Sequence, residues 1–516
     1  MLVNEFLEQS AVKFPNKTAL IFEGERLTFL ELEIMANRLA HGFIEKGLKK
    51  QDRVAIFLEP GTECVASIFA ALKAGGVFLV INPQVKAKKL AYILSDCQVK
   101  ILVTDTNHFQ EIASVLPGCS FLRSLVVTDY EGLERKKPAR HRPDLSSYRE
   151  ILDSCPPHRP ANSCIDIDLA SLIYTSGSTG IPKGVMLTHL NMVTAAASII
   201  EYLENTPDDI IIDVLPLSFD YGLYQVLMAF KFGGTVVLER SFLYPYRTID
   251  LILKERVTGL PIVPTVAAVL FNLKNLDKYD FSNVRYITNT AQAIPPRYIA
   301  RLQKIFPKAK IYSMYGLTEC KRVSFLPPDE IERRPTSVGK AMPNTEAYIV
   351  DAKGRKITKP GVVGELVVRG SHVMKGYWNL PEETDKVLKP GLLPDEKVLY
   401  TGDLFKMDQE GFLYFIARRD DLIKVAGGRV SPREIENVLY EIEDVDEAAV
   451  IGVKHKILGQ AVKAFIVLKK GSAATKKDIL KHCATRLEDF MVPKYIEFRE
   501  SLPKSSHGKI SKKELR

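Results

Sequence analysis

The sequence predicts an α/β fold with a large N-terminal domain of mostly parallel sheets and a small β unit, followed by a small mobile C-terminal α/β domain. Three observations support this prediction. The chain has 516 residues, which is too long for one hydrophobic core. Its first part alternates apolar strand-like runs with helical periodicity, and from about Val338 shorter runs between Gly, Pro and Asp turns follow. The C-terminal part returns to a compact alternation of helix and strand.

The parallel sheet is predicted from β-branched apolar runs that alternate with helices. Strands are expected at 54–58, 77–81, 101–104, 169–174, 233–238 and 260–263, and helices at 62–73 and 86–95. Continuous apolar strands separated by helices are typical of parallel sheets that are covered on both faces. The stretch 129–166 is rich in Pro, Arg and Ser, so we expect a surface excursion there.

The smaller units are predicted from shorter patterns. Runs at 347–350, 364–369 and 411–416 indicate an antiparallel β unit. The C-terminal part has helical patterns at 433–440 and 476–487 and strand patterns at 447–453 and 461–468. The polar run 418–421 precedes this part. We therefore expect two domains, residues 1–418 and residues 419–516.

Composition narrows the class of protein. Hydrophobic residues make up 46% and charged residues 26% of the chain, which is ordinary for a soluble globular protein. Lys and Arg exceed Asp and Glu by 71 − 62 = 9. This excess suits anionic small molecules, but a solvated surface explains it equally well. The basic residues are scattered, so we do not expect nucleic-acid binding.

Cysteine usage and apolar stretches bear on the compartment. The seven cysteines are odd in number and include no C-x-x-C pair, so we expect free thiols without a zinc site or disulfide framework. The N-terminus lacks the basic start and apolar core of a signal peptide. Lys73 and the Gly75-Gly76 pair interrupt the most apolar stretch, 64–81, which predicts a buried helix and a buried strand. We expect a cytoplasmic protein without a membrane span.

The most informative segment is a glycine-rich loop, Tyr174-Thr-Ser-Gly-Ser-Thr-Gly-Ile-Pro-Lys-Gly184. Glycines allow the backbone to approach a ligand closely, and amides, hydroxyls and a lysine can hold phosphate oxygens. The candidate phosphate-binding residues are Thr175, Ser176, Gly177, Ser178, Thr179, Gly180 and Lys183. Gly184 follows the lysine, so this is not a Walker loop. The alternative, a flexible Gly/Ser loop, is weak because a strand-like run precedes the segment.

Four further segments follow this loop in order. They are Met314-Tyr-Gly-Leu-Thr-Glu319, Tyr400-Thr-Gly-Asp403, Arg418-Arg-Asp-Asp-Leu-Ile-Lys-Val-Ala-Gly-Gly-Arg429 and Pro503-Lys-Ser-Ser-His-Gly-Lys-Ile-Ser-Lys-Lys-Glu-Leu-Arg516. Together with the loop, they make the chain resemble the adenylate-forming superfamily, which contains acyl-CoA synthetases, peptide-synthetase adenylation domains and beetle luciferases. The resemblance covers essentially the whole chain.

The resemblance implies a nucleotide site. It assigns Tyr315 to the adenine, Thr318 to the phosphate and Glu319 to Mg²⁺, directly or through water. It also implies that Asp403 accepts hydrogen bonds from the ribose hydroxyls and that Arg418 contacts the nucleotide. A single carboxylate such as Glu319 is consistent with a Mg²⁺ site, because this ion prefers oxygen ligands and needs only one or two carboxylates when phosphates supply the rest.

The resemblance also implies a mobile C-terminal domain. Asp420 corresponds to the hinge, and the Gly427-Gly428 turn to the loop that approaches a pantetheine thiol in the second half-reaction. Lys509 corresponds to the catalytic lysine. An ammonium beside the α-phosphate can stabilise the charge that grows there in the transition state.

Two segments bear on the pocket for the acid. Many acyl-CoA synthetases have His where this chain has Phe219. Amino-acid-activating domains often have Phe-Asp, so Asp220 either pairs a substrate ammonium or caps a helix. Ala291 and Gln292 replace the usual Gly-Gly and predict a narrow pocket for a small or polar acid. Arg322 either meets a substrate carboxylate or pairs with a neighbour.

The resemblance therefore implies an AMP-forming acid–thiol ligase that uses ATP and Mg²⁺. It would convert a carboxylic acid to its acyl-adenylate and then to a thioester with CoA. The alternatives are loading of an amino acid or small acid onto the phosphopantetheine of a carrier protein, and amide formation from the same adenylate. A luciferase-like oxygenase and an inactive nucleotide-binding scaffold are further classes that the motifs leave open.

Overall fold

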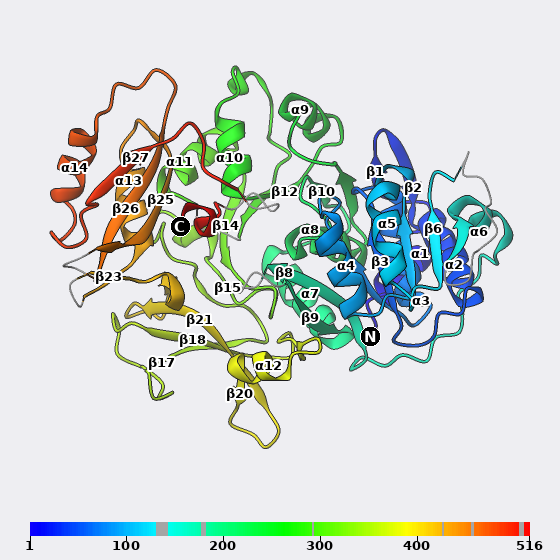
Figure 1. Cartoon of the computed structure of the whole chain (residues 1–516). Helices are drawn as coiled ribbons and strands as arrows, with labels where there is room; N and C mark the ends of the chain where they lie inside the picture. Colours follow the sequence, from blue (N-terminus) through cyan, green and yellow to red (C-terminus); the bar gives the residue numbers. More distant parts are fainter. Residues whose placement is uncertain (131–142, 177–181, 291–293, 426–427, 456–458, 505–509) are drawn as a thin grey trace.

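The computed structural model describes residues 1–130, 143–176, 182–290, 294–425, 428–455, 459–504 and 510–516. The described residues form four β-sheets with helices around them (Figure 1). Two large, mostly parallel sheets make up the N-terminal part, an antiparallel sheet follows, and a mixed sheet lies in the C-terminal part. The predicted fold class is thereby confirmed.

An eight-stranded sheet contains the first predicted strands. Its order is β19 (Gly376–Tyr377), β9 (Pro182–Thr188), β8 (Leu169–Ser176), β4 (Val77–Val80), β3 (Arg53–Phe57), β5 (Ile101–Thr104), β6 (Ser124–Val127) and β7 (Asp144–Ser147). Strands β3 to β8 pair in parallel, whereas β9 runs antiparallel to both β8 and β19. The apolar stretch 64–81 forms α3 (Thr62–Lys73) and β4, both largely buried, as predicted.

A nine-stranded sheet contains the later strands. Its order is β16 (Lys340–Ala341), β15 (Ser324–Phe325), β14 (Lys310–Tyr315), β13 (Tyr286–Asn289), β12 (Gly259–Ile262), β10 (Ile210–Asp213), β11 (Thr235–Leu238), β1 (Thr18–Phe22) and β2 (Glu25–Thr28). The central strands from β14 to β1 are parallel. The predicted strands are thus divided between two sheets, a partition that the apolar pattern alone does not reveal.

Helices surround both large sheets. They are α1 (Glu5–Lys13), α2 (Phe29–Glu45), α3, α4 (Ala87–Asp96), α5 (Phe109–Val115), α6 (Tyr148–Ser154), α7 (His189–Leu203), α8 (Asp220–Phe232), α9 (Pro245–Lys254), α10 (Pro264–Phe271) and α11 (Pro296–Ile305). Capping boxes fix the start of α2 at Thr28 and of α7 at Thr188, because each threonine and the residue three positions later exchange hydrogen bonds. Helix α8 is buried along most of its length.

The smaller β unit is confirmed as an antiparallel sheet. It contains β17 (Glu346–Val350), β18 (Gly364–Arg369), β21 (Lys397–Met407), β20 (Leu388–Pro390) and β22 (Leu413–Arg418), and α12 (Pro381–Val387) precedes β20. This sheet positions two residues of the candidate site, because Asp403 on β21 lies opposite Arg418 on β22.

The C-terminal part is a mixed α/β layer. Its sheet contains β24 (Gly428–Val430), β23 (Ile423–Val425), β26 (Gly459–Leu468), β25 (Val445–His455) and β27 (Tyr495–Phe498), with helices α13 (Pro432–Tyr440), α14 (Lys476–Ala484) and α15 (Lys512–Leu515). Two hydrophobic clusters consist entirely of residues from this part. The boundary after Arg418 stays a prediction.

The stretch 129–166 contains regular secondary structure that its composition did not indicate. The surface excursion expected over 129–166 contains an edge strand, β7, and a helix, α6, whose N-cap Ser147 accepts a hydrogen bond from the amide of Glu150. A polar edge strand lacks the continuous apolar run of a central strand, so composition concealed it. The expectation of free thiols is confirmed, since all seven cysteines are unpaired with one another.

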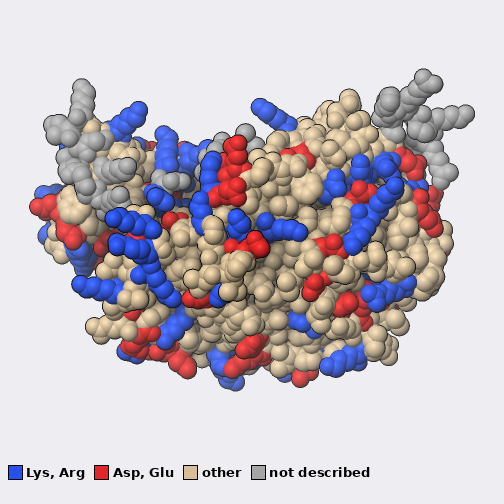
Figure 2. All heavy atoms as spheres, turned by 90° about the horizontal axis from the view of Figure 1, so that it is seen from below, with Lys and Arg blue, Asp and Glu red and all other residues tan. Residues whose placement is uncertain are grey.

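Two surface properties complete the description. Among the described residues, no helix is long and apolar enough to cross a membrane. Positive and negative side chains are interspersed over the face that Figure 2 shows, in line with their scattered positions in the sequence.

Candidate active site

The glycine-rich segment lies on the β8–β9 hairpin. Thr175 pairs with Lys183 and Ser176 with Pro182, while Gly177, Ser178, Thr179 and Gly180 lie outside the described residues. Gly184 lies at the base of the hairpin, where a side chain would be crowded. A Cβ atom there would lie 3.1 Å from Cζ of Tyr174 and 3.3 Å from Cβ of Trp378, which is tighter than ordinary contact.

Lys183 points toward α12 rather than into open solvent. Its Nζ lies 2.6 Å from Oε2 of Glu383, and 5.1 Å from the ring centre of Tyr377. The hydrogen bond from Lys183, followed by that from Lys386, lowers the pKa of Glu383 to about 2. Glu383 therefore stays ionised at neutral pH and is the partner of Lys183 in this structure.

Tyr315, Asp403 and Arg418 form a second group. The Tyr315 hydroxyl donates to Oδ2 of Asp403 at 2.6 Å, and Nε of Arg418 lies 3.6 Å from Oδ1. Asp403 is 3% exposed. Burial raises the pKa of this carboxyl, while Arg418 and the Tyr315 hydrogen bond act in the opposite direction. A buried carboxylate with donors already directed at it is well suited to accept hydroxyl groups from a ligand.

Glu319 lies at the turn that follows β14. Its Oε1 accepts a hydrogen bond from the Tyr377 hydroxyl at 2.7 Å, and its backbone oxygen accepts from the amide of Met374 at 2.7 Å. Thr318 is half-buried in the same turn. Burial, and next the nearby Glu319 charge, raise the pKa of Tyr377, which keeps its hydroxyl a donor. An anchored carboxylate of this kind fits Mg²⁺ that is held mainly by phosphates.

Tyr377 connects the glycine-rich hairpin to the turn that carries Glu319. Its ring faces the Lys183 ammonium and its hydroxyl holds Glu319, so one side chain links the β8–β9 hairpin to the turn after β14. Glu319 also contributes to the electrostatic environment of Asp403. Lys183, Tyr315, Glu319, Asp403 and Arg418, which are far apart in the sequence, are therefore brought together in one region.

The structure describes two of the four candidate residues of the acid pocket, Phe219 and Asp220. Phe219 is the N-cap residue of α8, makes no side-chain cap hydrogen bond and is 8% exposed. Asp220 is the first residue of the helix, so the hypothesis that its side chain is the N-cap is wrong. Instead, Oδ2 of Asp220 lies 3.2 Å from Nζ of Lys321. Ala291 and Gln292 lie outside the described residues.

Arg322 is also buried, with 2% exposure. Its guanidinium carbon lies 5.3 Å from the ring centre of Tyr221, and its charge lowers the pKa of the nearby Tyr202 against the larger, opposite effect of burial. Arg322 therefore lies among aromatic residues, and its choice between a substrate carboxylate and a neighbouring residue stays a prediction.

The C-terminal candidates are described only in part. Asp420 belongs to a 3-10 turn, Arg419–Asp421, between β22 and β23, and Gly428 begins β24 opposite Val425. Gly427 and Lys509 lie outside the described residues. Lys504 and Ile510, which flank the segment that contains Lys509, pair with each other as an isolated antiparallel bridge.

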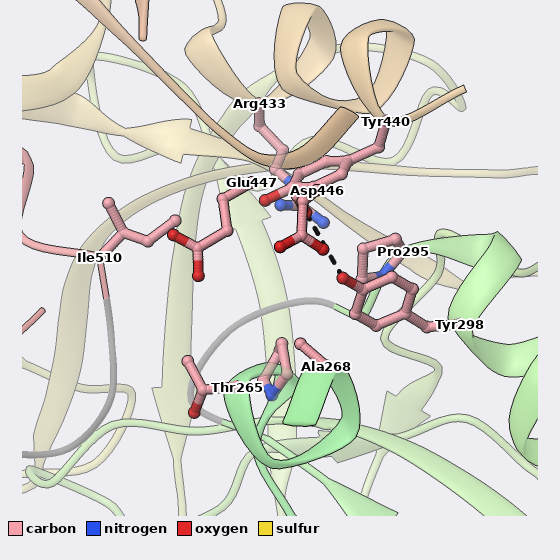
Figure 3. Close-up of a pocket in the computed structure, with 10 residues that line it drawn as sticks. Thr265, Ala268, Pro295, Tyr298, Arg433, Tyr440, Asp446, Glu447 and Ile510 are labelled. Atoms are coloured by element: carbon pink, nitrogen blue, oxygen red, sulfur yellow. Dashed lines mark hydrogen bonds between the residues drawn. The ribbon is translucent and has the colours of Figure 1, made fainter. Parts of the chain in front are cut away.

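The C-terminal part contacts α11 of the N-terminal part. Arg297 donates to the backbone oxygens of Ile442, at 3.0 Å, and Val445. The Tyr298 hydroxyl lies 3.5 Å from the backbone oxygen of Asp446, beside a cavity of about 30 Å³ (Figure 3). This cavity lies at the interface between the C-terminal part and helices α10 and α11.

Sequence reasoning missed three contacts. Tyr377 contacts Glu319, and Glu383 contacts Lys183. The Gly376-Tyr377 pair, which stands between turn residues, is the sequence pattern that could have indicated the first of these contacts. Lys321 gave no signal, because a lysine beside an arginine usually indicates a solvated surface.

Comparison with known proteins identifies the family. The model of the AMP-binding enzyme family matches residues 7–378, and that of the AMP-binding enzyme C-terminal domain matches residues 434–509. The chain therefore belongs to the AMP-binding enzyme family, within the adenylate-forming superfamily. The family that the sequence motifs resemble is thus confirmed.

Individual relatives cover nearly the whole chain. A protein of Bacillus subtilis named long-chain-fatty-acid–CoA ligase is 33% identical over 99% of this chain and 94% of its own length. The solved structure of ATP-bound MatB from Rhodopseudomonas palustris has a TM-score of 0.89 at 28% identity, covering 100% of this chain and 98% of that one. The anthranilate CoA ligase AuaEII, solved with anthranoyl-AMP, has a TM-score of 0.90 at 26% identity and covers 100% and 96%.

Proposed function

We propose that this protein is an ATP-dependent carboxylic acid–thiol ligase of the acyl-CoA synthetase type. The observation that carries the proposal is the convergence of Lys183, Tyr315, Glu319, Asp403 and Arg418 from separate motifs. The names of the relatives, which include CoA ligases for a long-chain fatty acid and for anthranilate, support it. The substrate would be a carboxylic acid, and the acyl acceptor the thiol of CoA.

The first half-reaction would form the acyl-adenylate. The substrate carboxylate attacks the α-phosphorus of ATP, a P–O bond forms, and the bond to pyrophosphate breaks. Asp403, fixed by Tyr315, would accept the ribose hydroxyls. Lys183 and the amides of the hairpin would hold the outgoing phosphates. Lys509 would stabilise the charge on the α-phosphate oxygens as they become more negative.

Mg²⁺ would bind through Glu319, which Tyr377 orients. When bound, the metal neutralises part of the phosphate charge. Glu319 needs to supply only one oxygen, because phosphates and water complete the shell of this ion.

The second half-reaction would transfer the acyl group. The pantetheine thiol attacks the acyl carbon, a C–S bond forms and AMP leaves with the electrons of the acyl–phosphate bond. We propose that residues 419–516 form a domain that turns about Asp420, so that Lys509 serves the first step and the Gly427-Gly428 turn the second. The same adenylate could also be delivered to the phosphopantetheine of a carrier protein.

The test separates the two half-reactions. Purified protein is screened for pyrophosphate release with fatty, aryl and amino acids, and the products are analysed after CoA, a carrier protein or an amine is added. Lys509→Ala should lose pyrophosphate release yet convert a supplied acyl-adenylate to the thioester. Lys513→Ala, at an exposed lysine of the same segment, is the control. Equal loss of both steps in Lys509→Ala contradicts the division of labour, and absence of pyrophosphate release with every acid contradicts the proposal.

A further inference from the structure

Lys321 is a buried basic residue beside the proposed acid pocket. Its side chain is 3% exposed, and its backbone adopts the left-handed region with φ 60°. The turn that places it is tight, because a Cβ on Gly316 would lie 2.1 Å from the backbone oxygen of Lys321. A lysine is rarely buried unless its charge is paired, so its partners indicate why it is there.

The partner of Lys321 is the N-terminus of α8. Its Nζ donates to the backbone oxygen of Asp220 at 2.5 Å and lies 3.2 Å from Oδ2 of the same residue. The ring centre of Tyr224 lies 4.3 Å from the ammonium. A carboxylate, a carbonyl and an aromatic face therefore surround Lys321, which leaves Asp220 already neutralised within the protein.

The location of this pair matters for substrate choice. Asp220 follows β10 and Lys321 follows β14, two parallel strands of the same sheet, at their carboxyl ends. Ligands of open α/β sheets bind at this edge, and Lys321 is only two residues from Glu319. A carboxylate buried here would attract the ammonium of an amino-acid substrate if it had no internal partner.

The basic residues around Asp220 also disfavour a substrate ammonium. Arg322 adds a second buried cation next to Lys321. The additional carboxyl, Asp213, is fully buried, and burial raises its pKa well above the usual range, which favours its neutral form. Lys321 and Arg322 thus place two basic side chains at this site, and a further cation from a substrate would be disfavoured beside them.

We propose that Lys321 acts as a built-in substitute for a substrate ammonium, so that the Asp220–Lys321 pair selects carboxylic acids without an α-amino group. This inference rests on the proposed acid-activating function. It assigns substrate choice to Lys321 and excludes amino acids as the preferred substrates.

The experiment compares matched acids. Pyrophosphate release is measured with hexanoate and 2-aminohexanoate, or another such pair at the chain length that the wild type prefers, for wild type and Lys321→Ala. The wild type should prefer the unsubstituted acid. Lys321→Ala should shift the ratio of kcat/KM values toward the amino acid by about tenfold or more, since a charge-assisted hydrogen bond to Asp220 becomes available. Turnover of the unsubstituted acid by Lys321→Ala should fall, because Asp220 loses its partner. Methylammonium or ethylammonium should restore this turnover by taking the place of the lysine ammonium.

The double variant Asp220→Asn/Lys321→Met is the matched control, because it removes both charges and nearly preserves the lysine volume. It should show neither ammonium rescue nor a shift toward the amino acid. A wild-type preference for the amino acid overturns the inference, whether or not the variants fold. Folded Lys321→Ala with an unchanged ratio and no rescue overturns it too. Both outcomes leave acid activation intact, whereas no pyrophosphate release by the wild type with any acid overturns the proposed function itself.

Discussion

The hydroxyl of Tyr315 donates a 2.6 Å hydrogen bond to Oδ2 of Asp403, although the two residues lie 88 positions apart in the chain. Tyr315 ends β14 of the nine-stranded sheet and Asp403 lies on β21 of the antiparallel sheet. The contact therefore joins two sheets and fixes the rotamer of a carboxylate that is almost fully buried. The proposed ribose contact depends on this arrangement.

Asp403→Asn should weaken ATP use more than acid use. An amide is a poorer acceptor than a carboxylate and presents one oxygen instead of two. We expect the KM for ATP to rise by about 10- to 100-fold, as for loss of a charge-assisted hydrogen bond, while the KM for the acid changes little. Steady-state kinetics of pyrophosphate release checks this. Tyr315→Phe keeps the carboxylate and should have the smaller effect; the reverse order would argue against Asp403 as the ribose acceptor.

Glu383→Gln should strengthen ATP binding. Lys183 is occupied by Glu383 at 2.6 Å in this structure, so a phosphate group has to compete with that carboxylate. Removal of the charge should lower the Kd for ATP several-fold, and Lys183→Ala should raise it. Calorimetric titration with ATP and Mg²⁺ measures both. Glu382→Gln is the control, because this neighbour on α12 is exposed and belongs to the same helical turn. Equal effects of the two glutamine variants would mean that only long-range charge matters.

Glu319→Gln should increase the Mg²⁺ concentration needed for half-maximal pyrophosphate release by about tenfold or more, because a neutral amide oxygen binds a hard cation less strongly. Tyr377→Phe should shift the same curve in the same direction by less, since the carboxylate remains but loses the donor that orients it. Titration with Mg²⁺ at saturating ATP gives both values. An unchanged Mg²⁺ curve in Glu319→Gln would remove Glu319 from the proposed metal site.

Acid should destabilise the fold through His189. This imidazole is 1% exposed, and its Nδ1 accepts the amide of Val3 at 3.0 Å, so the neutral form is the one that fits. Burial lowers its pKa to about 4 from the ordinary 6.5. Stability from the neutral form is complete above pH 6.5 and is lost as the pH falls toward 4, because the unfolded state binds the proton first.

The expected loss through His189 is about 2 kcal/mol of unfolding free energy between pH 7 and pH 5. Urea unfolding at the two pH values measures it. His189→Gln should reduce the difference by that amount, whereas His158→Gln, at an exposed histidine, should leave it unchanged. An identical pH dependence in wild type and His189→Gln would contradict the assignment.

Several elements were predictable because their determinants are local. The helix predicted at 62–73 and the strands at 101–104 and 364–369 have the predicted bounds. Apolar periodicity decides such segments, since each buries one defined face or is buried throughout. The strand β7 was not predictable in this way, because an edge strand can be polar and depends on its neighbour for hydrogen bonds.

Within the candidate site, the motifs alone identified the family and the residue types of the proposed nucleotide site, because each motif is continuous in the chain. Which side chains meet became clear from the three-dimensional fold. It paired Lys183 with Glu383 and Glu319 with Tyr377, and it showed that Asp220 has an internal cation, Lys321, 101 residues away. The physical reason is that burial and charge pairing depend on how distant strands are ordered in a sheet, and strand order leaves no local trace in the sequence.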